Sequence, residues 1–385
     1  MAKEGRAVVW WVSLLSVLSL LSGVTCAEEL RLAAEAVALV DGQTGVLLYG
    51  KNAFTRRSIA SLTKVMTIFL TAENIQAGKI KMDDVVVADA KAQSLEGTEL
   101  KVKQGQSFTV EELLYAAALI SANDAAYMLA VHQAGSEAAF AQQMTQRARE
   151  LGLEDTNFTD ATGLNPSWEG NYSTAYDLAQ LFRVAIQNPI FARVVGTARY
   201  RINSLGLEIT NSNPLLGEYP GNEGGKTGFT TPAGHSLVTS ATIEGWRLVA
   251  VVLGGPNREA RQQDTKELLN YGFENLQLVI RKGEVVGTGP LSGGARSKVQ
   301  LVAGSDFKAH VPPGYDGPPL ERRLELDSPP PEAPVDPGQP FGRLVFYRGE
   351  EEVGSIPAVA KHGVGTANVV TRVISWFLGL FGRRP

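Results

Sequence analysis

A serine and a lysine lie three positions apart at Ser61 and Lys64, in the run Ser-Leu-Thr-Lys. On a helix this spacing places both side chains on one face, a turn apart. A serine hydroxyl becomes a nucleophile when a neighbour removes its proton, and a desolvated lysine amine can be that base. The pair therefore predicts acyl-transfer chemistry, but only weakly, because Ser305 and Lys308 have the same spacing.

Two further motifs accompany Ser61 and not Ser305. Ser121-Ala122-Asn123 is the single Ser-x-Asn sequence in the chain and falls where one predicted helix should end and another begin. Lys226-Thr227-Gly228 is the single Lys-Thr-Gly sequence and falls where the pattern turns to strand. An acyl-transfer site needs a nucleophile, a proton route, a grip on the substrate and donors for an oxyanion. The motifs supply side chains for most of these tasks.

Each motif residue fits a particular task in such a site. Ser121 could pass a proton between the base and a leaving amine, and the Asn123 amide could hold a backbone carbonyl of the substrate. Lys226 adds positive charge, Thr227 offers a hydroxyl to a terminal carboxylate, and Gly228 allows close approach to the strand backbone. Taken singly, these residues also fit ordinary roles as a helix cap, a turn residue or a surface charge.

The three motifs, in this order, form the signature of penicillin-recognising serine acyl transferases. The chain resembles the D-alanyl-D-alanine carboxypeptidases, the low-molecular-mass penicillin-binding proteins, from about Ala34 to Phe273. The resemblance is carried by residues 57–64, 151–158, 172–179 and 224–230. The chain departs from the family pattern at Gly225, where an aliphatic residue is frequent, and at Ala122, where glycine is common.

The resemblance implies a fold, a substrate and an oxyanion hole. The fold would be α/β and β-lactamase/transpeptidase-like, with an antiparallel sheet, helices on both its faces and a helical subdomain. The substrates would be peptidoglycan stem peptides, from which the terminal D-alanine is removed, and β-lactam antibiotics would acylate the same serine. The backbone N–H groups of Ser61 and Phe229 would form the oxyanion hole.

The hydrophobic pattern independently predicts an α/β domain. A hairpin is expected within residues 35–49, helices at 63–76, 109–120, 123–132, 137–151 and 258–271, and strands at 235–243 and 247–253. Capping boxes are expected at Thr109 and at Thr174, the second of which assigns Asp177 to a helix cap rather than to catalysis. Strands at both ends of a helical middle suggest one shared sheet. After Phe273, short strands and turns predict a small all-β domain.

The N-terminus predicts export. Lys3 and Arg6 precede an apolar run at residues 7–21 and the small residues Thr25-Cys26-Ala27, which is typical of a secretory signal cleaved after Ala27. An uncleaved anchor and a lipid on Cys26 are alternatives. The predicted domains are a signal at 1–27, a catalytic domain at 28–275, a β-rich domain at 276–360 and a C-terminal helix at 366–385.

The C-terminus predicts attachment to a membrane surface. Apolar residues of 369–381, Trp376 among them, fall on one broad helical arc, and Arg383 and Arg384 follow. Such a helix suits the bilayer interface and is too short to span it. We expect a Gly- and Pro-containing stretch at 354–365 to separate it from the β-rich domain; packing on the protein's own core is the alternative. The expected location is the outer face of the cytoplasmic membrane.

Composition excludes several other classes of site. A formal charge of −4 gives no basic surface for nucleic acid. Cys26 is the one cysteine, so a chain cleaved after Ala27 would have no disulfide, thiolate nucleophile or cysteine-ligated metal. The four histidines have no metal-ligand spacing, and no cofactor or metal is expected.

Two rival functions remain open at this point. A class A-like β-lactamase would need a Glu-x-x-x-Asn element past Ser121 to activate its deacylating water. This chain has Glu154 followed by Phe158 at the fourth position. The other rival is a catalytically idle protein that binds muropeptides, which a fluorescent penicillin would leave unlabelled.

Overall fold

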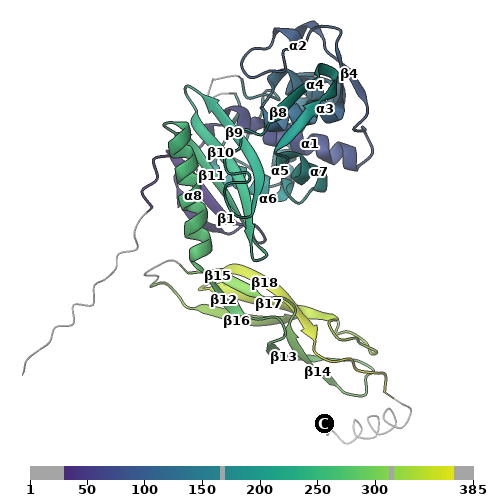
Figure 1. Cartoon of the computed structure of the whole chain (residues 1–385). Helices are drawn as coiled ribbons and strands as arrows, with labels where there is room; N and C mark the ends of the chain where they lie inside the picture. The colour runs from purple at the N-terminus through teal and green to yellow at the C-terminus, as the bar shows by residue number, and fades with distance from the viewer. Residues whose placement is uncertain (1–29, 165–169, 312–315, 368–385) are drawn as a thin grey trace, which may run out of the picture.

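The computed structural model describes residues 30–164, 170–311 and 316–367. The predicted signal at 1–27 lies outside the described residues, as does nearly all of the predicted helix at 366–385. A larger domain and a smaller all-β domain lie end to end (Figure 1). In the described ranges, no helix combines the length and apolar character needed to cross a membrane.

The larger domain is built on a five-stranded antiparallel sheet that joins both ends of the predicted catalytic domain. Its strand order is β2-β1-β11-β10-β9. The strands are β1 (Ala36–Asp41), β2 (Leu47–Lys51), β9 (Asn222–Thr230), β10 (Gly234–Ile243) and β11 (Trp246–Gly255). β1 is buried along its whole length, as expected for a strand covered on both faces. β9 forms one edge of the sheet.

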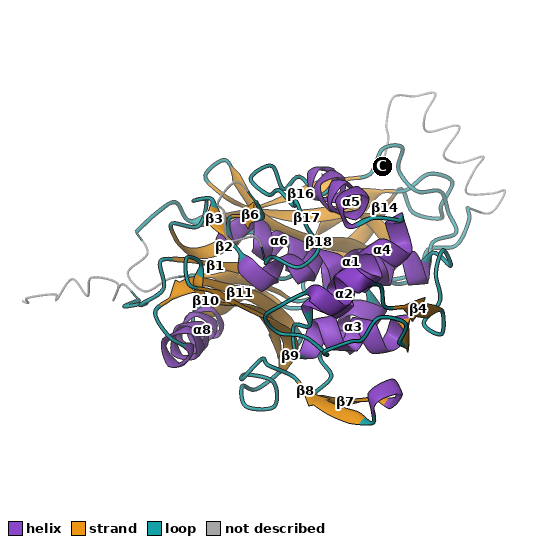
Figure 2. Ribbon diagram, turned by 90° about the horizontal axis from the view of Figure 1, so that it is seen from above, coloured by secondary structure: helices purple, strands orange, loops and turns teal. Residues whose placement is uncertain are grey.

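Helices cover both faces of this sheet, as predicted (Figure 2). α8 (Arg258–Glu274) packs Leu268 and Leu269 against Leu39 and Leu248 on one face. On the other face, α6 (Ala175–Ala185) contacts β1, β10 and β11 and packs against α1 (Lys64–Gln76). Two of the sequence motifs belong to these elements, since Lys64 begins α1 and Lys226, Thr227 and Gly228 lie in β9.

A helical subdomain surrounds α1. Its helices are α2 (Ala90–Ser94), α3 (Val110–Leu119), α4 (Asn123–Ala134), α5 (Glu137–Glu150) and α7 (Pro189–Val195). The capping box at Thr109 is present, with Glu112 bonded back to the cap. Short elements complete the domain: β3 (Arg57–Ser58), η1 (Ala60–Thr63), β4 (Val85–Val87), β5 (Ser107–Thr109), β6 (Tyr172–Ser173), β7 (Arg199–Ile202), η2 (Asn203–Leu205) and β8 (Leu207–Thr210).

The start of α6 differs in one detail from the prediction. Thr174 caps the helix by accepting a hydrogen bond from the Asp177 backbone N–H. The Asp177 carboxylate does not complete a capping box; its Oδ2 accepts from the Asp155 N–H at 3.1 Å and from Thr156 Oγ1 at 2.8 Å. Asp177 therefore ties α6 to the preceding loop, and its role is structural.

The smaller domain is all-β, as predicted. Its main sheet has the order β13-β14-β18-β17-β16, beside a β12–β15 ladder. The strands are β12 (Leu276–Ile280), β13 (Val285–Pro290), β14 (Lys298–Ala303), β15 (Phe307–His310), β16 (Leu320–Leu326), β17 (Pro340–Arg348) and β18 (Glu351–Ala360). The expectation of a separating stretch at 354–365 is wrong, because β18 is the central strand of the sheet. Backbone bonding continues as far as Ala367 N–H, which donates to Gly293 O.

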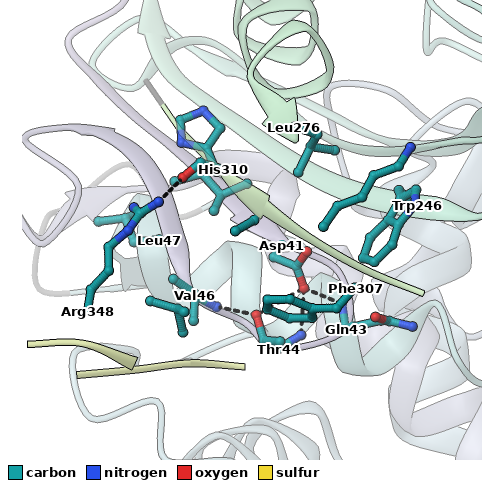
Figure 3. A pocket seen from close by; sticks show the side chains of 14 residues that line it. Asp41, Gln43, Thr44, Val46, Leu47, Trp246, Leu276, Phe307, His310 and Arg348 are labelled. Carbon is teal, nitrogen blue, oxygen red and sulfur yellow. Dashed lines mark hydrogen bonds between the residues drawn. The ribbon is translucent and has the colours of Figure 1, made fainter. Parts of the chain in front are cut away.

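The two domains meet at a short junction. Asn275 alone separates α8 from β12, and its carbonyl accepts a hydrogen bond from the Val311 N–H at 2.8 Å. Figure 3 shows a pocket of about 120 Å³ here, between the turn at Asp41 and Thr44 and the β-domain residues Phe307, His310 and Arg348. This volume is too small for a substrate peptide.

The second Ser-x-x-Lys sequence lies at this junction and makes no catalytic pair. Ser305 is exposed, while Lys308 forms an ion pair with Glu244 of the larger domain at 3.2 Å. Close by, the rings of Tyr271 and His310 pack across the junction at 5.1 Å. Burial lowers the pKa of His310 to about 4, so the ring is neutral at ordinary pH. The ion pair with Glu244 gives Lys308 a structural role at the junction.

Candidate active site

The candidate nucleophile lies in a tight turn at the start of α1. Ser61 is in η1, and Lys64 begins α1 directly after it. Ala60, just before Ser61, has a φ of 46°, a left-handed conformation that a non-glycine residue adopts only when its surroundings impose it. Lys64 is completely buried, and its Nζ lies 3.1 Å from Ser61 Oγ. The predicted nucleophile and base are therefore in contact.

The Lys64 amine is held by two further oxygens. Its Nζ donates to Asn123 Oδ1 at 2.7 Å and to the Thr162 carbonyl at 2.6 Å. Burial disfavours the charged amine and lowers the pKa of Lys64 to about 7, while nearby carboxylates oppose this shift. A substantial fraction of the amine is therefore neutral near neutral pH, as a general base requires.

Ser121 lies on the connection between α3 and α4, as predicted, and Asn123 is the first residue of α4. Ser121 has a φ of 66°, and its buried Oγ has no hydrogen-bond partner among the described residues. Asn123 Nδ2 donates to Glu96 O at 2.8 Å, which fixes the amide with its oxygen toward Lys64. Gly97 makes room for this amide, since a Cβ there would lie 2.9 Å from Asn123 Nδ2. Asn123 thus orients the base, a role that its sequence motif alone did not indicate.

Lys226, Thr227 and Gly228 lie on the edge strand β9. Lys226 is 1% exposed and donates to the Thr227 carbonyl at 2.6 Å, which excludes the alternative of an ordinary surface charge. Burial, reinforced by the charge of Lys64, holds the pKa of Lys226 well below its usual range. Thr227 Oγ1 lies 2.8 Å from Ser212 Oγ. The threonine hydroxyl therefore belongs to a small polar cluster.

Two glycines set how closely β9 can pack. A Cβ at Gly228 would lie 3.1 Å from Ile59 O and 3.2 Å from the Leu62 nitrogen, so the glycine lets β9 approach the turn that carries Ser61. A Cβ at Gly225 would lie 2.3 Å from Val238 O on the neighbouring strand β10. An aliphatic residue at position 225, which is frequent in the family pattern, would therefore not fit in this chain without a shift of the backbone.

A cleft of about 430 Å³ opens in front of these residues. Of the predicted site residues, Ser61, Ser121, Thr227, Gly228 and Phe229 line it, and the buried Lys64, Asn123 and Lys226 do not. Phe229 is 55% exposed, and its ring stacks on that of His235 with the ring centroids 4.2 Å apart. The fold thus brings all the predicted motifs together around one cleft.

Sequence reasoning missed two arginines in the cleft. Arg258 and Arg261 lie in the first turn of α8 and line it. Arg261 is 7% exposed, and its Nε has no hydrogen-bond partner in the described parts of the chain. The helix start was detectable from Asn257, which caps α8, but only the fold shows that this end of α8 lines the same cleft as β9. The arginines make this side of the cleft suited to an anion.

Carboxylates are not found among the described residues that line the cleft. Glu154, the candidate for a β-lactamase-type base, is exposed and lies elsewhere. Within the described ranges, no group of three or more His, Cys, Asp or Glu side chains is placed to hold a metal ion. The chemistry that this cleft offers is thus that of a serine, a lysine and hydrogen-bond donors.

Comparison with known proteins gives matches over both domains. Residues 23–257 match the family model described as D-alanyl-D-alanine carboxypeptidase, and residues 273–366 match that of the penicillin-binding protein 5 C-terminal domain. D-alanyl-D-alanine carboxypeptidase DacF of Bacillus subtilis is 31% identical over 349 residues, covering 89% of each chain.

Solved structures of penicillin-binding proteins are similar to this chain in fold. Penicillin-binding protein 5 of Haemophilus influenzae is 28% identical with a TM-score of 0.68, covering 87% of this chain and 98% of its own. Penicillin-binding protein D2 of Listeria monocytogenes, solved in its ampicillin-bound form, is 32% identical with a TM-score of 0.59, covering 64% of this chain and 99% of its own. These matches confirm the predicted fold and family resemblance.

Proposed function

The chain belongs to the D-alanyl-D-alanine carboxypeptidase family, and from this premise we propose that Ser61 carries the acyl group while the terminal D-alanine is removed from a peptidoglycan stem pentapeptide. The observation that carries this proposal is the contact of Ser61 Oγ with a buried Lys64 amine whose pKa is about 7. A nucleophile and a base matched to neutral pH are what serine acyl transfer requires.

The bonds around Lys64 suggest how the serine is activated. A neutral amine has two N–H groups and one lone pair. Because Asn123 Oδ1 and the Thr162 carbonyl accept the two N–H groups, the lone pair is left for the proton of Ser61. As that proton moves to Lys64, Ser61 Oγ attacks the carbonyl carbon of the penultimate D-alanine.

The remaining steps use the residues on the other side of the cleft. The backbone N–H groups of Ser61 and Phe229 would stabilise the tetrahedral oxyanion. When the intermediate collapses, the C–N bond to the terminal D-alanine breaks, and Ser121 passes a proton from Lys64 to the leaving amine. Water then hydrolyses the ester on Ser61, and the shortened peptide leaves.

The arginines and Thr227 would recognise the free carboxylate of the terminal D-alanine. Thr227 and Ser212 offer hydroxyls, while Arg261 and Arg258 offer positive charge from the start of α8. Charge-assisted hydrogen bonds of this kind are short and strong. Lys226 is buried and would act indirectly, since its amine donates a hydrogen bond to the Thr227 carbonyl and so supports the residue that carries the hydroxyl.

The same cleft would react with β-lactams. Penicillin-binding protein D2, which is similar to this chain, has been solved with ampicillin bound. A penicillin would acylate Ser61 by opening its β-lactam ring, and we expect slow release because the described lining lacks a carboxylate to activate water. This expectation separates the proposal from the β-lactamase alternative.

We further propose that the protein is exported and attached to the outer face of the cytoplasmic membrane through residues 366–385. The support is the composition of the two chain ends, both of which lie outside the described residues except for Thr366 and Ala367. The cleft lies at the first turn of α8 and the β domain follows its last residue. The seventeen residues of α8 span about 25 Å, so the helix would hold the cleft away from the membrane surface.

Mass spectrometry of pentapeptide muropeptides incubated with the protein tests the enzymatic proposal. The expected result is loss of one D-alanine from each stem peptide, and prior treatment with penicillin should prevent it. Intact pentapeptides together with absence of penicillin labelling would instead support an idle binding protein. Rapid release of hydrolysed penicillin would support a β-lactamase.

A further inference from the structure

We propose that Asp160 is a positioning residue for the catalytic base: it holds the Thr162 carbonyl against the Lys64 amine and places a negative charge behind that amine. The inference rests on the proposed role of Lys64 as the base. Asp160 belongs to none of the three sequence motifs. Its carboxylate is not part of the cleft lining, so it would act through Lys64 rather than on the substrate.

The geometry of one tight turn carries the first half of this inference. Asp160 Oδ1 accepts three hydrogen bonds, from Thr162 N–H at 2.7 Å, Thr162 Oγ1 at 2.8 Å and Gly163 N–H at 2.6 Å. These bonds set the orientation of the Thr162 peptide, whose carbonyl lies 2.6 Å from Lys64 Nζ. The carboxylate therefore positions one of the two oxygens that orient the amine.

The same turn presses against the backbone that precedes the nucleophile. Gly163 has a φ of 79°, and a Cβ there would lie 1.9 Å from Ala60 O. Ala60 is the strained residue next to Ser61. The turn therefore contacts the base Lys64 through the Thr162 carbonyl, and it packs through Gly163 against Ala60, the residue before the nucleophile.

Neighbouring elements hold the turn in place. The Asn171 side chain brackets Asp160: its Oδ1 accepts from the Asp160 N–H and its Nδ2 donates to the Asp160 carbonyl, both at 3.3 Å. The Ala161 carbonyl accepts from Thr67 Oγ1 on α1 at 2.8 Å. The Ala161 N–H donates to Glu137 Oε1 on α5 at 3.4 Å. The turn is thus fixed to the helix that carries the base.

Charge carries the second half of the inference. Asp160 Oδ2 is buried and has no hydrogen-bond donor among the described residues, so this oxygen's charge is not offset by a local bond. Of the groups that face Lys64, Asp160 opposes the effect of burial on the pKa of the amine most strongly, followed by Asp124 and Glu137. The other nearby amine is that of Lys226, whose own pKa is lowered by burial and by Lys64.

Asp124 and Glu137 are less suited to this task. Both oxygens of the Asp124 carboxylate accept hydrogen bonds, from the backbone N–H groups of Leu100, Val102 and Ala125, whereas only Oδ1 of Asp160 does so among the described residues. Burial raises the pKa of Glu137, with Asp160 adding to the rise and Lys91 opposing it, so Glu137 carries its charge less readily. Asp160 is therefore the group whose removal should change the titration of Lys64 most.

The sign of the effect follows from the role of the base. Acylation needs the neutral amine, so its rate rises with pH through the pKa of Lys64, which is about 7. Removing the negative charge of Asp160 makes protonation of the amine harder and lowers that pKa further. The rise in rate with pH should then move to lower pH in an Asp160→Asn variant, whose amide oxygen can still accept the three bonds of the turn.

The experiment measures the acylation rate constant with a fluorescent penicillin between pH 5 and pH 9, using the intact protein and Asp160→Asn. We expect the rise to shift down by about one pH unit in the variant. Glu137→Gln should shift it less and in the same direction. Glu150→Gln is the matched control, since this exposed residue lies on the same helix as Glu137, and it should leave the profile unchanged.

An unshifted profile in a folded Asp160→Asn protein would overturn the charge role, even if the maximum rate fell. If the asparagine variant does not fold, Asp160→Ser keeps an acceptor oxygen for the turn without the charge, and the same downward shift is expected. Failure of the unaltered protein to react with penicillin at any pH would contradict the proposed function itself, which is a different result from an unshifted profile.

Discussion

At the scale of single residues, Ser61 differs from the other serine of a Ser-x-x-Lys sequence in having its lysine within hydrogen-bonding distance. Its hydroxyl contacts Lys64 Nζ, whereas Ser305 is exposed and Lys308 is paired with Glu244. Ser61→Ala should therefore reduce penicillin labelling and peptidase activity by more than about a thousand-fold. The thermal unfolding temperature should change little, because a small hydroxyl is lost. Labelling is read on gels and unfolding by circular dichroism.

Ser305→Ala is the control for this substitution, because it removes the serine of the other Ser-x-x-Lys sequence. It should label like the unaltered protein. Labelling that survived in Ser61→Ala and disappeared in Ser305→Ala would show that the nucleophile is assigned to the wrong domain.

Thr227 also acts at the residue scale, through its hydroxyl in the polar cluster with Ser212. Thr227→Val keeps the shape of the side chain and removes the donor. We expect its preference for a substrate with a free terminal carboxylate over the amidated peptide to fall roughly 10- to 100-fold, the effect of one hydrogen bond to a charged group. The measurement is kcat/KM for both peptides.

Arg261→Gln provides the comparison. If Thr227→Val kept full discrimination while Arg261→Gln lost it, the carboxylate would be recognised by the arginine alone. If neither variant changed the ratio, this side of the cleft would not bind the carboxylate.

At the scale of elements, β9 is confined between β10 and the turn that carries Ser61. Valine at position 225 would match the aliphatic residue frequent in the family, but its Cβ would meet Val238 O at 2.3 Å. Gly225→Val should therefore lower the free energy of unfolding by about 2–3 kcal/mol, as measured by urea denaturation. Gly365→Ala is the control, since a Cβ there meets nothing within 4 Å. Equal stability of the two variants would contradict the steric account.

The sequence predicted those elements whose signals are local. The Thr109 capping box marked the start of α3, and two strand-like runs at residues 235–243 and 247–253 marked β10 and β11. It missed β18 as a strand, because Gly354 and Pro357 suggest a break, while the neighbouring strands β14 and β17 supply the pairing that holds it. Local pattern cannot report such long-range pairing.

The residues of the site also fall into those that the sequence predicted and those that only the fold reveals. Ser61, Thr227 and their motif partners were found because side-chain type and order identify them. The Thr162 carbonyl was not found, since every residue has a carbonyl and only the fold places this one at Lys64. Arg261 was missed for a similar reason, because only the packing of α8 on the sheet places this side chain at the cleft.

At the scale of the whole molecule, the proposed membrane attachment can be tested by shortening the chain. The cut belongs after Ala367 rather than near Ala360, because Val364 and Thr366 still pair with Val335 and Gly294 in the β domain. We expect the shortened protein to be active and to leave the membrane fraction, because all proposed catalytic residues lie far upstream. Fractionation of cells producing either form, followed by penicillin labelling, checks this. A shortened protein that still pelleted with membranes would place the attachment at the N-terminus.

The one-residue connection at Asn275 has a consequence for which peptides the enzyme meets. Since only Asn275 separates α8 from β12, and Lys308 and Glu244 form an ion pair between the two domains, the folded protein itself sets the distance from the β domain to Ser61. If the protein is attached to the membrane beyond its β domain, the cleft would lie at a fixed distance from the bilayer. Stem peptides of peptidoglycan at that distance would be trimmed, and those closer to the lipid would not reach Ser61.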